Sequence, residues 1–294
     1  MKSLLAALRR GQPLVSDGAW GTFLYQRGLT PGECPELWNV THPADVAAIA
    51  ESYVAAGADI ILTNSFGGSP HKLAAYGLAD RAAELNVAAA AISRAAAGGG
   101  HFVLGSMGPT GVMLMMGEVP EETLAEGFAL QAAALQRGGV DALCLETFSA
   151  VDEASVAIRA AKDATGLEIA CTFTFEKTVT GDFRTMMGVS VEEMVATVKE
   201  AGADIIGTNC GNGFEQMINI VRAIRRVDTT TPVLVHANAG KPLFIDGRTV
   251  YPETPADMAG RVGELLAAGA NIVGGCCGTG PAHIRALADA IRRR

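Results

Sequence analysis

The stretch GADIILTN at residues 57–64 recurs in three further versions, and this repeat decides the fold. The other copies are GVDALCLE at 139–146, GADIIGTN at 202–209 and GANIVGGC at 269–276. Each copy begins with glycine, continues into a short apolar run and is followed by a segment of helical period. Apolar strands that alternate with helices are typical of βα units around a parallel sheet.

The same alternation extends over the whole chain and predicts eight strands. They are expected at 14–16, 60–63, 102–105, 142–145, 169–174, 205–207, 233–235 and 272–274. Helices are expected at 44–56, 72–97, 121–137, 151–165, 190–201, 214–226, 255–268 and 281–293. No linker rich in Pro or Ser divides the chain, so we expect a single domain over residues 1–294. Eight βα units in one domain favour the α/β class and a (β/α)8 TIM barrel, with a doubly wound open sheet as the alternative.

Composition excludes several classes of partner. The chain has 294 residues, of which 49% are hydrophobic, and carries a net charge of -8. This charge gives no electrostatic reason to bind nucleic acid or an anionic membrane. The first apolar run, Leu4–Leu8, is too short for a signal peptide, and no stretch reaches the ~18 apolar residues of a spanning helix. We therefore expect a cytoplasmic protein, in which the six cysteines are metal ligands, catalytic thiols or core residues rather than disulfides.

The repeat also predicts which side chains meet. Seven and eight residues after each repeat glycine lie polar or thiol residues, at the carboxyl ends of the second, fourth, sixth and eighth predicted strands: Asn64 and Ser65, Glu146 and Thr147, Asn209 and Cys210, Cys276 and Cys277. In a barrel the side chains of alternate strands share one interior layer. The sequence therefore predicts that these residues gather at one mouth of the barrel.

Three of these residues, Cys210, Cys276 and Cys277, are flanked by glycines. Adjacent strand residues point to opposite faces, so neighbouring thiols reach one ion only if the backbone leaves strand geometry, which glycine permits. A disulfide between Cys276 and Cys277 is disfavoured because adjacent Cα atoms lie ~3.8 Å apart, closer than the usual ~4.4 Å or more. Three soft ligands favour zinc with a fourth position open. Core or loop filling and a redox pair remain the alternatives.

The other cysteines and the histidines lack such a setting. Cys144 and Cys171 lie inside apolar runs, where a buried core role is expected. The five histidines are scattered over separate units, which disfavours histidine ligands. His236 ends the seventh predicted strand and is interpreted as a core or rim histidine with its hydrogen bonds satisfied.

Several fragments occur together in order along the chain: Asp17-Gly18-Ala19-Trp20-Gly21-Thr22, Asn64-Ser65-Phe66-Gly67, Gly108-Pro109-Thr110-Gly111, Glu146-Thr147-Phe148, Asn209-Cys210, Asn238-Ala239-Gly240-Lys241-Pro242 and Gly274-Gly275-Cys276-Cys277-Gly278-Thr279. In this combination the chain resembles the homocysteine S-methyltransferase family, most closely the homocysteine-binding module of cobalamin-dependent methionine synthase. The resemblance covers nearly the whole chain.

This resemblance implies a zinc ion on Cys210, Cys276 and Cys277 and methyl transfer to homocysteine, which gives methionine. A neutral thiol with a pKa near ~8.5 is a poor nucleophile at neutral pH, whereas a metal-bound thiol is deprotonated. Attack on a methyl group by in-line displacement depends on positioning, so no general base is expected.

The resemblance also implies contacts to the rest of the substrate. Asp17 and Glu146 are expected to pair with the ammonium of homocysteine. Backbone N–H groups of two segments can bind its carboxylate on general grounds: Gly18-Ala19-Trp20-Gly21 and Asn64-Ser65. Asn238 resembles a residue that fills the fourth zinc position before the substrate arrives. Without a ligand role, Asp17 would be a turn or cap residue and Asn238 a turn asparagine.

The methyl donor is less well defined by the sequence. The chain ends directly after the eighth predicted helix and is expected to lack folate and corrinoid modules, so the methyl group is expected from a small activated donor or from methylcobalamin on a separate protein. Methylcobalamin, free or on a separate methylcorrinoid protein, is favoured over a sulfonium compound or betaine because the chain resembles the methionine-synthase module most closely. Aromatic residues could wall a donor cavity or only fill loops: Trp20, Phe23, Phe66 and Phe148. The long loop Met107–Met116 is expected to carry function, and Glu118 and Lys241 are expected to be solvated.

Two rival functions remain. A zinc-storage or thiol-sensing barrel without a substrate would bind the same metal, but in a closed site with four ligands. An aldolase-like enzyme would use the segment 238–241 after the seventh strand, where many barrels bind phosphate. Three thiols in the same mouth argue against the second rival.

Overall fold

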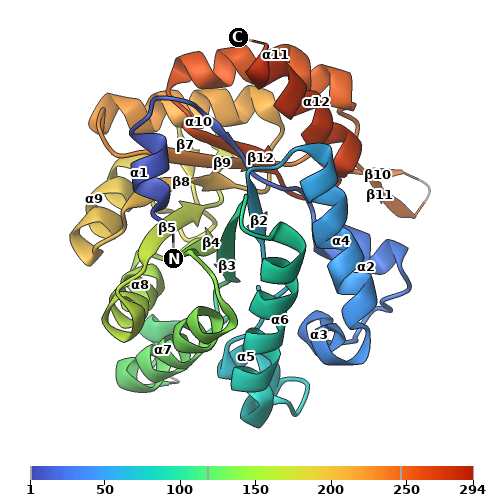
Figure 1. Cartoon of the computed structure of the whole chain (residues 1–294). Coiled ribbons are helices and arrows are strands. Elements are labelled where there is room, and N and C mark those ends of the chain that lie inside the picture. Colours follow the sequence, from blue (N-terminus) through green and yellow to red (C-terminus); the bar gives the residue numbers. More distant parts are fainter. Residues whose placement is uncertain (1, 118, 246, 294) are drawn as a thin grey trace.

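The computed structural model describes residues 2–117, 119–245 and 247–293, and it confirms the predicted (β/α)8 TIM barrel (Figure 1). Eight parallel strands pair in the order β1-β12-β9-β8-β5-β4-β3-β2. A parallel bridge between Ser16 and Ile60 brings the two ends of this order together and closes the ring. The strands are β1 (Leu14–Val15), β2 (Ile60–Leu62), β3 (Phe102–Met107), β4 (Ala142–Phe148), β5 (Glu168–Phe173), β8 (Ile205–Asn209), β9 (Val233–Ala237) and β12 (Ile272–Gly275).

The helices lie outside the ring of strands (Figure 1). The large ones are α4 (Pro43–Ala56), α6 (Ala82–Ala97), α7 (Glu121–Gly138), α8 (Val151–Thr165), α9 (Val191–Ala201), α10 (Phe214–Val227), α11 (Pro255–Ala268) and α12 (Pro281–Arg292). Short helices are α1 (Leu4–Leu8), α2 (Gly21–Gln26), η1 (Pro35–Leu37), α3 (Trp38–Thr41), α5 (Pro70–Ala74), η2 (Ala79–Arg81) and η3 (Leu114–Met116). None of the helices in the described ranges is long and apolar enough to cross a membrane.

One predicted helix was wrong in its extent. The sequence predicted a continuous helix over 72–97, but the structure has α5, a turn, η2 and then α6. Gly77 adopts φ 68°, a left-handed conformation that no helix can continue through. The alanine-rich period conceals this break because the residues on both sides favour helix.

The four copies of the sequence repeat form the same contacts at the amino-terminal ends of β2, β4, β8 and β12, here called the lower end of the barrel. The glycine of the repeat ends the preceding helix in the left-handed conformation in every copy, with φ 94°, 101°, 107° and 115°. The third residue of the repeat accepts a hydrogen bond from a backbone N–H of the neighbouring strand: Asp59 from Val15 (2.8 Å), Asp141 from Val103 (3.0 Å), Asp204 from Ile169 (2.9 Å) and Asn271 from Val233 (2.8 Å). The repeat is therefore a helix cap followed by a clamp on the preceding strand of the ring.

A cationic side chain from a surrounding helix completes each clamp. The pairs are Arg292 with Asp59, Arg94 with Asp141, Lys162 with Asp204 and Arg225 with Asn271. A hydrogen bond that also involves charge contributes more to stability than a neutral one. Four such clamps fix the strand register at the end of the barrel opposite the carboxyl-terminal ends of the strands.

The interior of the barrel is apolar below and polar above. One buried cluster comprises inward-facing strand residues together with Leu4 of α1, which closes the floor; the strand residues include Ile60, Leu104, Ala142, Ile205 and Ile272. Cys144 belongs to this cluster, and Cys171 belongs to the larger core between strands and helices, as predicted for both. The layer above, at the carboxyl ends of the strands, holds the polar residues.

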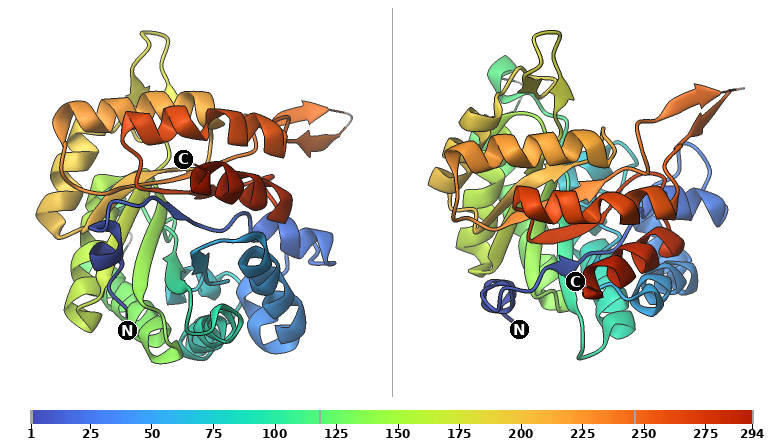
Figure 2. Two further views of the ribbon diagram at one scale, coloured as in Figure 1. Left: turned by 45° about the horizontal axis from the view of Figure 1, so that its top comes forward. Right: turned by 90° about the horizontal axis from the view of Figure 1, so that it is seen from above.

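Two antiparallel hairpins, which the sequence did not predict, follow strands at this upper end. The first pairs β6 (Glu176–Lys177) with β7 (Phe183–Arg184), and the second pairs β10 (Leu243–Ile245) with β11 (Arg248–Val250). Both stand out from the body of the barrel in Figure 2. They expose apolar side chains, among them Met186 near the first hairpin and Phe244 on the second.

Candidate active site

A cavity of about 390 Å³ opens at the carboxyl ends of the strands. Its lining includes eight of the nine predicted site residues: Asp17, Gly18, Asn64, Ser65, Glu146, Cys210, Cys276 and Cys277. These residues come from β1, β2, β4, β8 and β12 and the turns that follow them. The structure therefore brings together side chains up to about 260 residues apart in the sequence, as expected for this face of a barrel.

The three thiols form one cluster. The Sγ atoms of Cys210, Cys276 and Cys277 all lie within 4.8 Å of one another, and those of Cys210 and Cys277 are 3.9 Å apart. A tetrahedral zinc site with Zn–S bonds of about 2.3 Å places its sulfurs about 3.8 Å apart. The three cysteines could thus hold one zinc ion after only small adjustments.

Strand β9 positions both cysteine loops. The backbone N–H of Cys210 donates to the carbonyl of His236 (2.9 Å), and that of Cys276 donates to the carbonyl of Ala237 (2.7 Å). Cys210 itself adopts φ 60°, which is uncommon for a residue other than glycine. This turn removes Cys210 from the alternation of β8 and directs its thiol toward Cys277.

The thiols also perturb one another. Hydrogen bonds from the Cys210 and Cys276 thiols, with a further one from the Tyr251 hydroxyl, lower the pKa of Cys277 well below that of a free thiol. Gly278 is required beside Tyr251, because a Cβ at this position would lie 2.2 Å from the tyrosine ring. Hydrogen bonding to Cys277 and burial raise the pKa of Cys210 to about 11, and hydrogen bonds to Cys210 and Cys277 raise that of Cys276 well above the value of a free thiol. The three thiols together therefore favour one thiolate, the form that binds a metal.

Asp17 is a buried acid that follows β1, the strand paired with β12, and its backbone carbonyl accepts a hydrogen bond from the N–H of Gly275 (2.8 Å). Its side chain is 1% exposed, and its Oδ2 accepts hydrogen bonds from the backbone N–H of Leu62 (2.8 Å) and from Trp20 Nε1 (2.9 Å). Burial raises the pKa of Asp17 to about 7, against these hydrogen bonds. Its second oxygen, Oδ1, has only a 3.5 Å contact with the Ser16 hydroxyl and is available to a ligand.

Glu146 is the second buried acid. Its Oε1 accepts a hydrogen bond from the Ser106 hydroxyl, and burial raises the pKa of Glu146 to about 7. Among the described residues that line the cavity, none is Lys or Arg. Two carboxylates buried without a cation are costly, and a bound ammonium group would offset this cost.

A third buried acid, Glu36, lines the cavity and was not predicted. Its Oε1 accepts a hydrogen bond from the backbone N–H of Gly67 (2.6 Å), and burial raises its pKa. Asn64 donates its side-chain amide to the carbonyl of Pro35 (2.8 Å) and to Asn39 Oδ1 (3.1 Å). The Asn64 side chain thus uses its amide N–H groups to hold the η1 segment against the 64–67 turn, and its backbone carbonyl accepts a hydrogen bond from Asn39 (2.8 Å). Glu36 was missed because it lies in an irregular segment without a periodic pattern.

Asn238 and His236 are the polar residues of β9 and its turn. Asn238 is 2% exposed and does not line the cavity; its Oδ1 has no hydrogen-bond partner among the described residues. His236 lines the cavity with Nε2 also unpartnered within the described ranges, so the expectation that its hydrogen bonds are satisfied was wrong. Burial lowers the pKa of His236 to about 4, which keeps the imidazole neutral.

The predicted aromatic wall forms only in part. Trp20 and Phe66 line the cavity, but Phe148 is fully buried between Phe128 and Phe173 behind β4. Phe23 packs against a tyrosine ring instead, 5.8 Å between centroids. Phe148 points away from the cavity because the register of β4 against β5 shifts just before this residue, so the side chains no longer alternate regularly between the two faces of the strand. Lys241 is exposed as predicted, and Glu118 lies outside the described residues.

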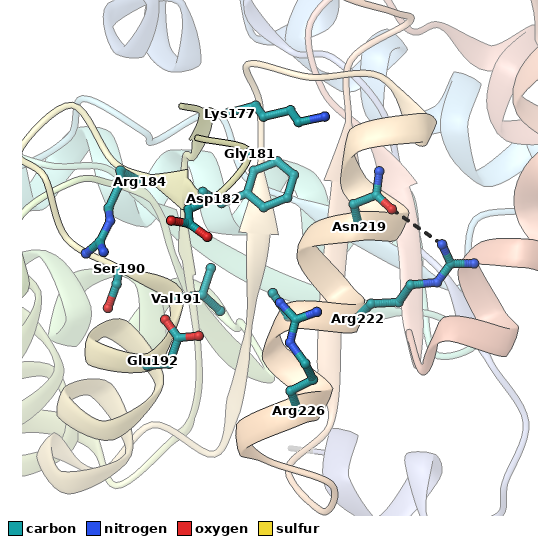
Figure 3. Close-up of a pocket in the computed structure, with 12 residues that line it drawn as sticks. Lys177, Gly181, Asp182, Arg184, Ser190, Val191, Glu192, Asn219, Arg222 and Arg226 are labelled. Atoms are coloured by element: carbon teal, nitrogen blue, oxygen red, sulfur yellow. Dashed lines mark hydrogen bonds between the residues drawn. The ribbon is translucent and has the colours of Figure 1, made fainter. Parts of the chain in front are cut away.

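Two further hollows lie nearby. A cavity of about 500 Å³ shares Thr147 with the thiol cavity and is lined by apolar side chains of the 109–114 loop, by Met186 and Met187, and by three acids: Asp152, Glu153 and Glu176. A groove of about 510 Å³ lies between the β6–β7 hairpin, α9 and α10 (Figure 3). Its charged side chains are exposed and of mixed sign, and none of the residues that line it is a thiol. The groove therefore lacks the chemistry of the first cavity.

Comparison with known proteins agrees with this geometry. A sequence model of the family described as homocysteine S-methyltransferase matches residues 14–291. The chain is 32% identical to a methionine synthase of Mycobacterium tuberculosis (strain ATCC 25618 / H37Rv) and 31% identical to one of Mycobacterium leprae (strain TN). Each alignment covers 95% of this chain but 24% of the relative, so the chain spans about a quarter of their length.

Solved structures show the same fold. The metallated form of the homocysteine methyltransferase MmuM from Escherichia coli superposes with a TM-score of 0.80 at 24% identity, over 97% of this chain and 99% of that one. Its oxidized form gives a TM-score of 0.76 at 25% identity, over 97% and 99% of the two chains.

Proposed function

Because the chain belongs to the homocysteine S-methyltransferase family, we propose that it transfers a methyl group to the thiol of homocysteine and yields methionine. The observation that carries this proposal is one cavity lined both by three clustered thiols and by two buried acids, Asp17 and Glu146, with no Lys or Arg among its described lining residues. Homocysteine has complementary groups at its two ends, a thiol and an ammonium. A ligand with only a thiol would not need the buried acids, and a ligand with only an ammonium would not need the cysteine cluster.

We assign the metal site to Cys210, Cys276 and Cys277, with zinc as the ion, because the donor set is all sulfur. Zinc bound there would supply a thiolate at neutral pH in place of a thiol. The unpartnered Oδ1 of Asn238 makes this residue a candidate for the fourth position before homocysteine binds. The site requires reduced thiols, which fits the expected cytoplasmic location.

The residues of the chain would position the substrate rather than move protons. Glu146 and Asp17 bind the ammonium in this proposal, and the backbone N–H groups of Gly18 and Asn64 bind the carboxylate. The N–H of Ser65, also expected to do so, already donates to the carbonyl of Thr63 (2.9 Å). Asp17 and Glu146 are buried, so their contacts are stronger than they would be on the surface. An oriented thiolate lowers the barrier to in-line attack because the entropy of alignment has already been lost on binding.

For the donor we propose methylcobalamin, free or on a separate methylcorrinoid protein. The segments that follow β5 and β9 at this end of the barrel carry exposed apolar side chains, with Met186 85% and Phe244 79% exposed, which suits a large apolar carrier. Betaine is disfavoured because a quaternary ammonium is best bound by several aromatic faces, and of the four expected aromatic residues only Trp20 and Phe66 line the cavity.

A sulfonium donor is the second candidate. The neighbouring cavity with Asp152, Glu153 and Glu176 contains no Lys or Arg among its described lining residues, and a cationic donor would be attracted by these acids. This cavity adjoins the thiol cavity through Thr147, so a donor bound there could present its methyl group to the sulfur.

A donor panel tests the proposal. The zinc-loaded protein is incubated with homocysteine and, in parallel, with methylcobalamin, a methylsulfonium compound or betaine, and methionine is quantified. We expect methionine with methylcobalamin. Turnover with betaine alone would contradict the donor assignment, and no methionine with any donor despite bound zinc and homocysteine would favour a non-enzymatic thiol-binding barrel.

A further inference from the structure

The carboxyl end of β4 is irregular. β4 pairs with β5 in register up to Leu145 and Cys171, and pairing resumes one residue out of step at Phe148 and Phe173. The intervening pair, Glu146 and Thr147, therefore forms a bulge. Thr147 adopts φ 67°, a conformation that a β-branched residue rarely takes without external support. Bulges beside active sites commonly redirect a side chain.

Asn209 supplies that support. Its Oδ1 accepts a hydrogen bond from the backbone N–H of Thr147 (2.8 Å), and its Nδ2 donates to Thr147 Oγ1 (2.7 Å). Asn209 lies on β8, and β5 separates β8 from β4. On β5 the Thr172 hydroxyl donates to the same Oδ1 (2.7 Å), which fixes the amide orientation. Asn209 is completely buried, so water does not compete for these contacts.

The bulge decides what faces the cavity. Ala142 and Cys144 point into the barrel, and Glu146 continues this series. Thr147 also lines the cavity, whereas Phe148 enters the core behind the strand. A regular strand would reverse the last two residues and insert the phenylalanine ring into the substrate cavity.

The same asparagine is covalently joined to the thiol site. Cys210 follows Asn209 directly and adopts φ 60°. The Thr174 hydroxyl donates to the backbone carbonyl of Asn209 (2.9 Å), which holds this turn from the other side. Through its side chain Asn209 fixes the residue after Glu146, and through its backbone it fixes Cys210.

We propose that Asn209 is a positioning residue that sets the separation between the Glu146 carboxylate and the Cys210 thiol, and that this separation selects homocysteine over cysteine. The inference rests on the proposed function, in which the two groups bind opposite ends of one amino acid. Cysteine is one methylene shorter and cannot reach both ends of a rigid site. A single methylene commonly changes recognition by about 10- to 200-fold.

The test compares binding of homocysteine and cysteine by calorimetric titration of the zinc-loaded protein, with metal content measured for every variant. Asn209→Ala is expected to lower the ratio of the two affinities by about tenfold, because the bulge then relaxes. Adding Thr147→Gly to Asn209→Ala should restore much of the ratio, since glycine adopts positive φ without support. If Asn209 only stabilised the fold, the losses of stability caused by Asn209→Ala and Thr147→Gly would add, and the second change would not restore the affinity ratio.

Asn212→Ala is the matched control. Asn212 is a buried asparagine on the same loop, and its amide donates to the carbonyl of Phe175 (2.6 Å) without contacting the bulge. It should leave the ratio unchanged. If Asn209→Ala does not fold, Thr172→Val removes one contact of the clamp and should lower the ratio by about twofold or more.

The outcomes separate the two proposals. Wild-type protein that prefers homocysteine, together with Asn209 and Thr172 variants that keep the wild-type ratio, overturns the positioning role and leaves the proposed function intact. Wild-type protein that binds zinc but neither thiol refutes the proposed function itself.

Discussion

At the amino-terminal ends of β2, β4, β8 and β12 the four repeat copies make the same contact, whereas at the carboxyl-terminal ends the same copies present four different pairs of side chains. The lower contacts are an Asp or Asn side chain on the N–H of the neighbouring strand. The upper pairs begin with Asn64, Glu146, Asn209 and Cys276. One end of each repeat therefore serves stability and the other serves chemistry, as in barrel enzymes generally.

The largest effect is expected at the upper end. Cys210→Ser, Cys276→Ser and Cys277→Ser should each reduce zinc affinity by at least about a hundredfold, because a thiolate ligand is lost. Metal analysis after dialysis checks this, with Cys144→Ala as the control for loss of a buried thiol away from the cluster. Stoichiometric, tightly held zinc in two of the three serine variants would contradict the assignment.

The lower end should respond in the opposite way. Asp141→Ala removes hydrogen bonds to the N–H groups of Lys2 and Val103 and the ion pair with Arg94. We expect the free energy of unfolding to fall by about 3 kcal/mol, since buried donors are left unsatisfied. Zinc and homocysteine binding by the folded fraction should be unchanged, and a parallel loss of zinc affinity would show that the two ends are not independent.

Next in size are the two buried acids. Asp17→Asn retains the oxygen that accepts from Leu62 and Trp20, and Glu146→Gln retains the one that accepts from Ser106. Each change removes only the charge offered to an ammonium, so homocysteine affinity should fall about ten- to a hundredfold while zinc remains. Titration curves that coincide with the wild-type curve in both variants would remove these residues from the substrate site.

The smallest effect is a pH dependence of stability. It should come from the two buried acids at the carboxyl-terminal end of the barrel rather than from the clamps at the amino-terminal end. Burial raises the pKa of Asp17 from 3.8, and that of Glu146 from 4.5, to about 7. The folded state then binds more protons than the unfolded state between about pH 4 and 7, so stability decreases as pH rises through this window. Without ligand, Asp17→Asn should therefore be more stable than wild type at pH 8 by about 1–3 kcal/mol, with the difference vanishing toward pH 4. Thermal unfolding at both pH values measures it, and equal stabilities at pH 8 would argue against a buried charge.

The sequence predicted the barrel because the repeat encodes local causes: a helix cap, a clamp and an apolar strand. It also predicted the thiol cluster and both acids, since strand phase places them at the same mouth. It did not predict the Thr147 bulge, which depends on Asn209 more than 60 residues away. Consequently Phe148 was expected to wall the cavity or to fill a loop, although it lies in the core. Glu36 was missed because it lies in a segment without a periodic pattern. The helix break at Gly77 was missed because helix-forming residues flank it on both sides.

The most direct test of the central claim is X-ray absorption at the zinc edge, before and after addition of homocysteine. We expect three sulfur ligands and one oxygen or nitrogen ligand in the free protein, and four sulfur ligands once homocysteine is bound. A site that already has four protein ligands and does not change on addition of homocysteine would contradict this expectation.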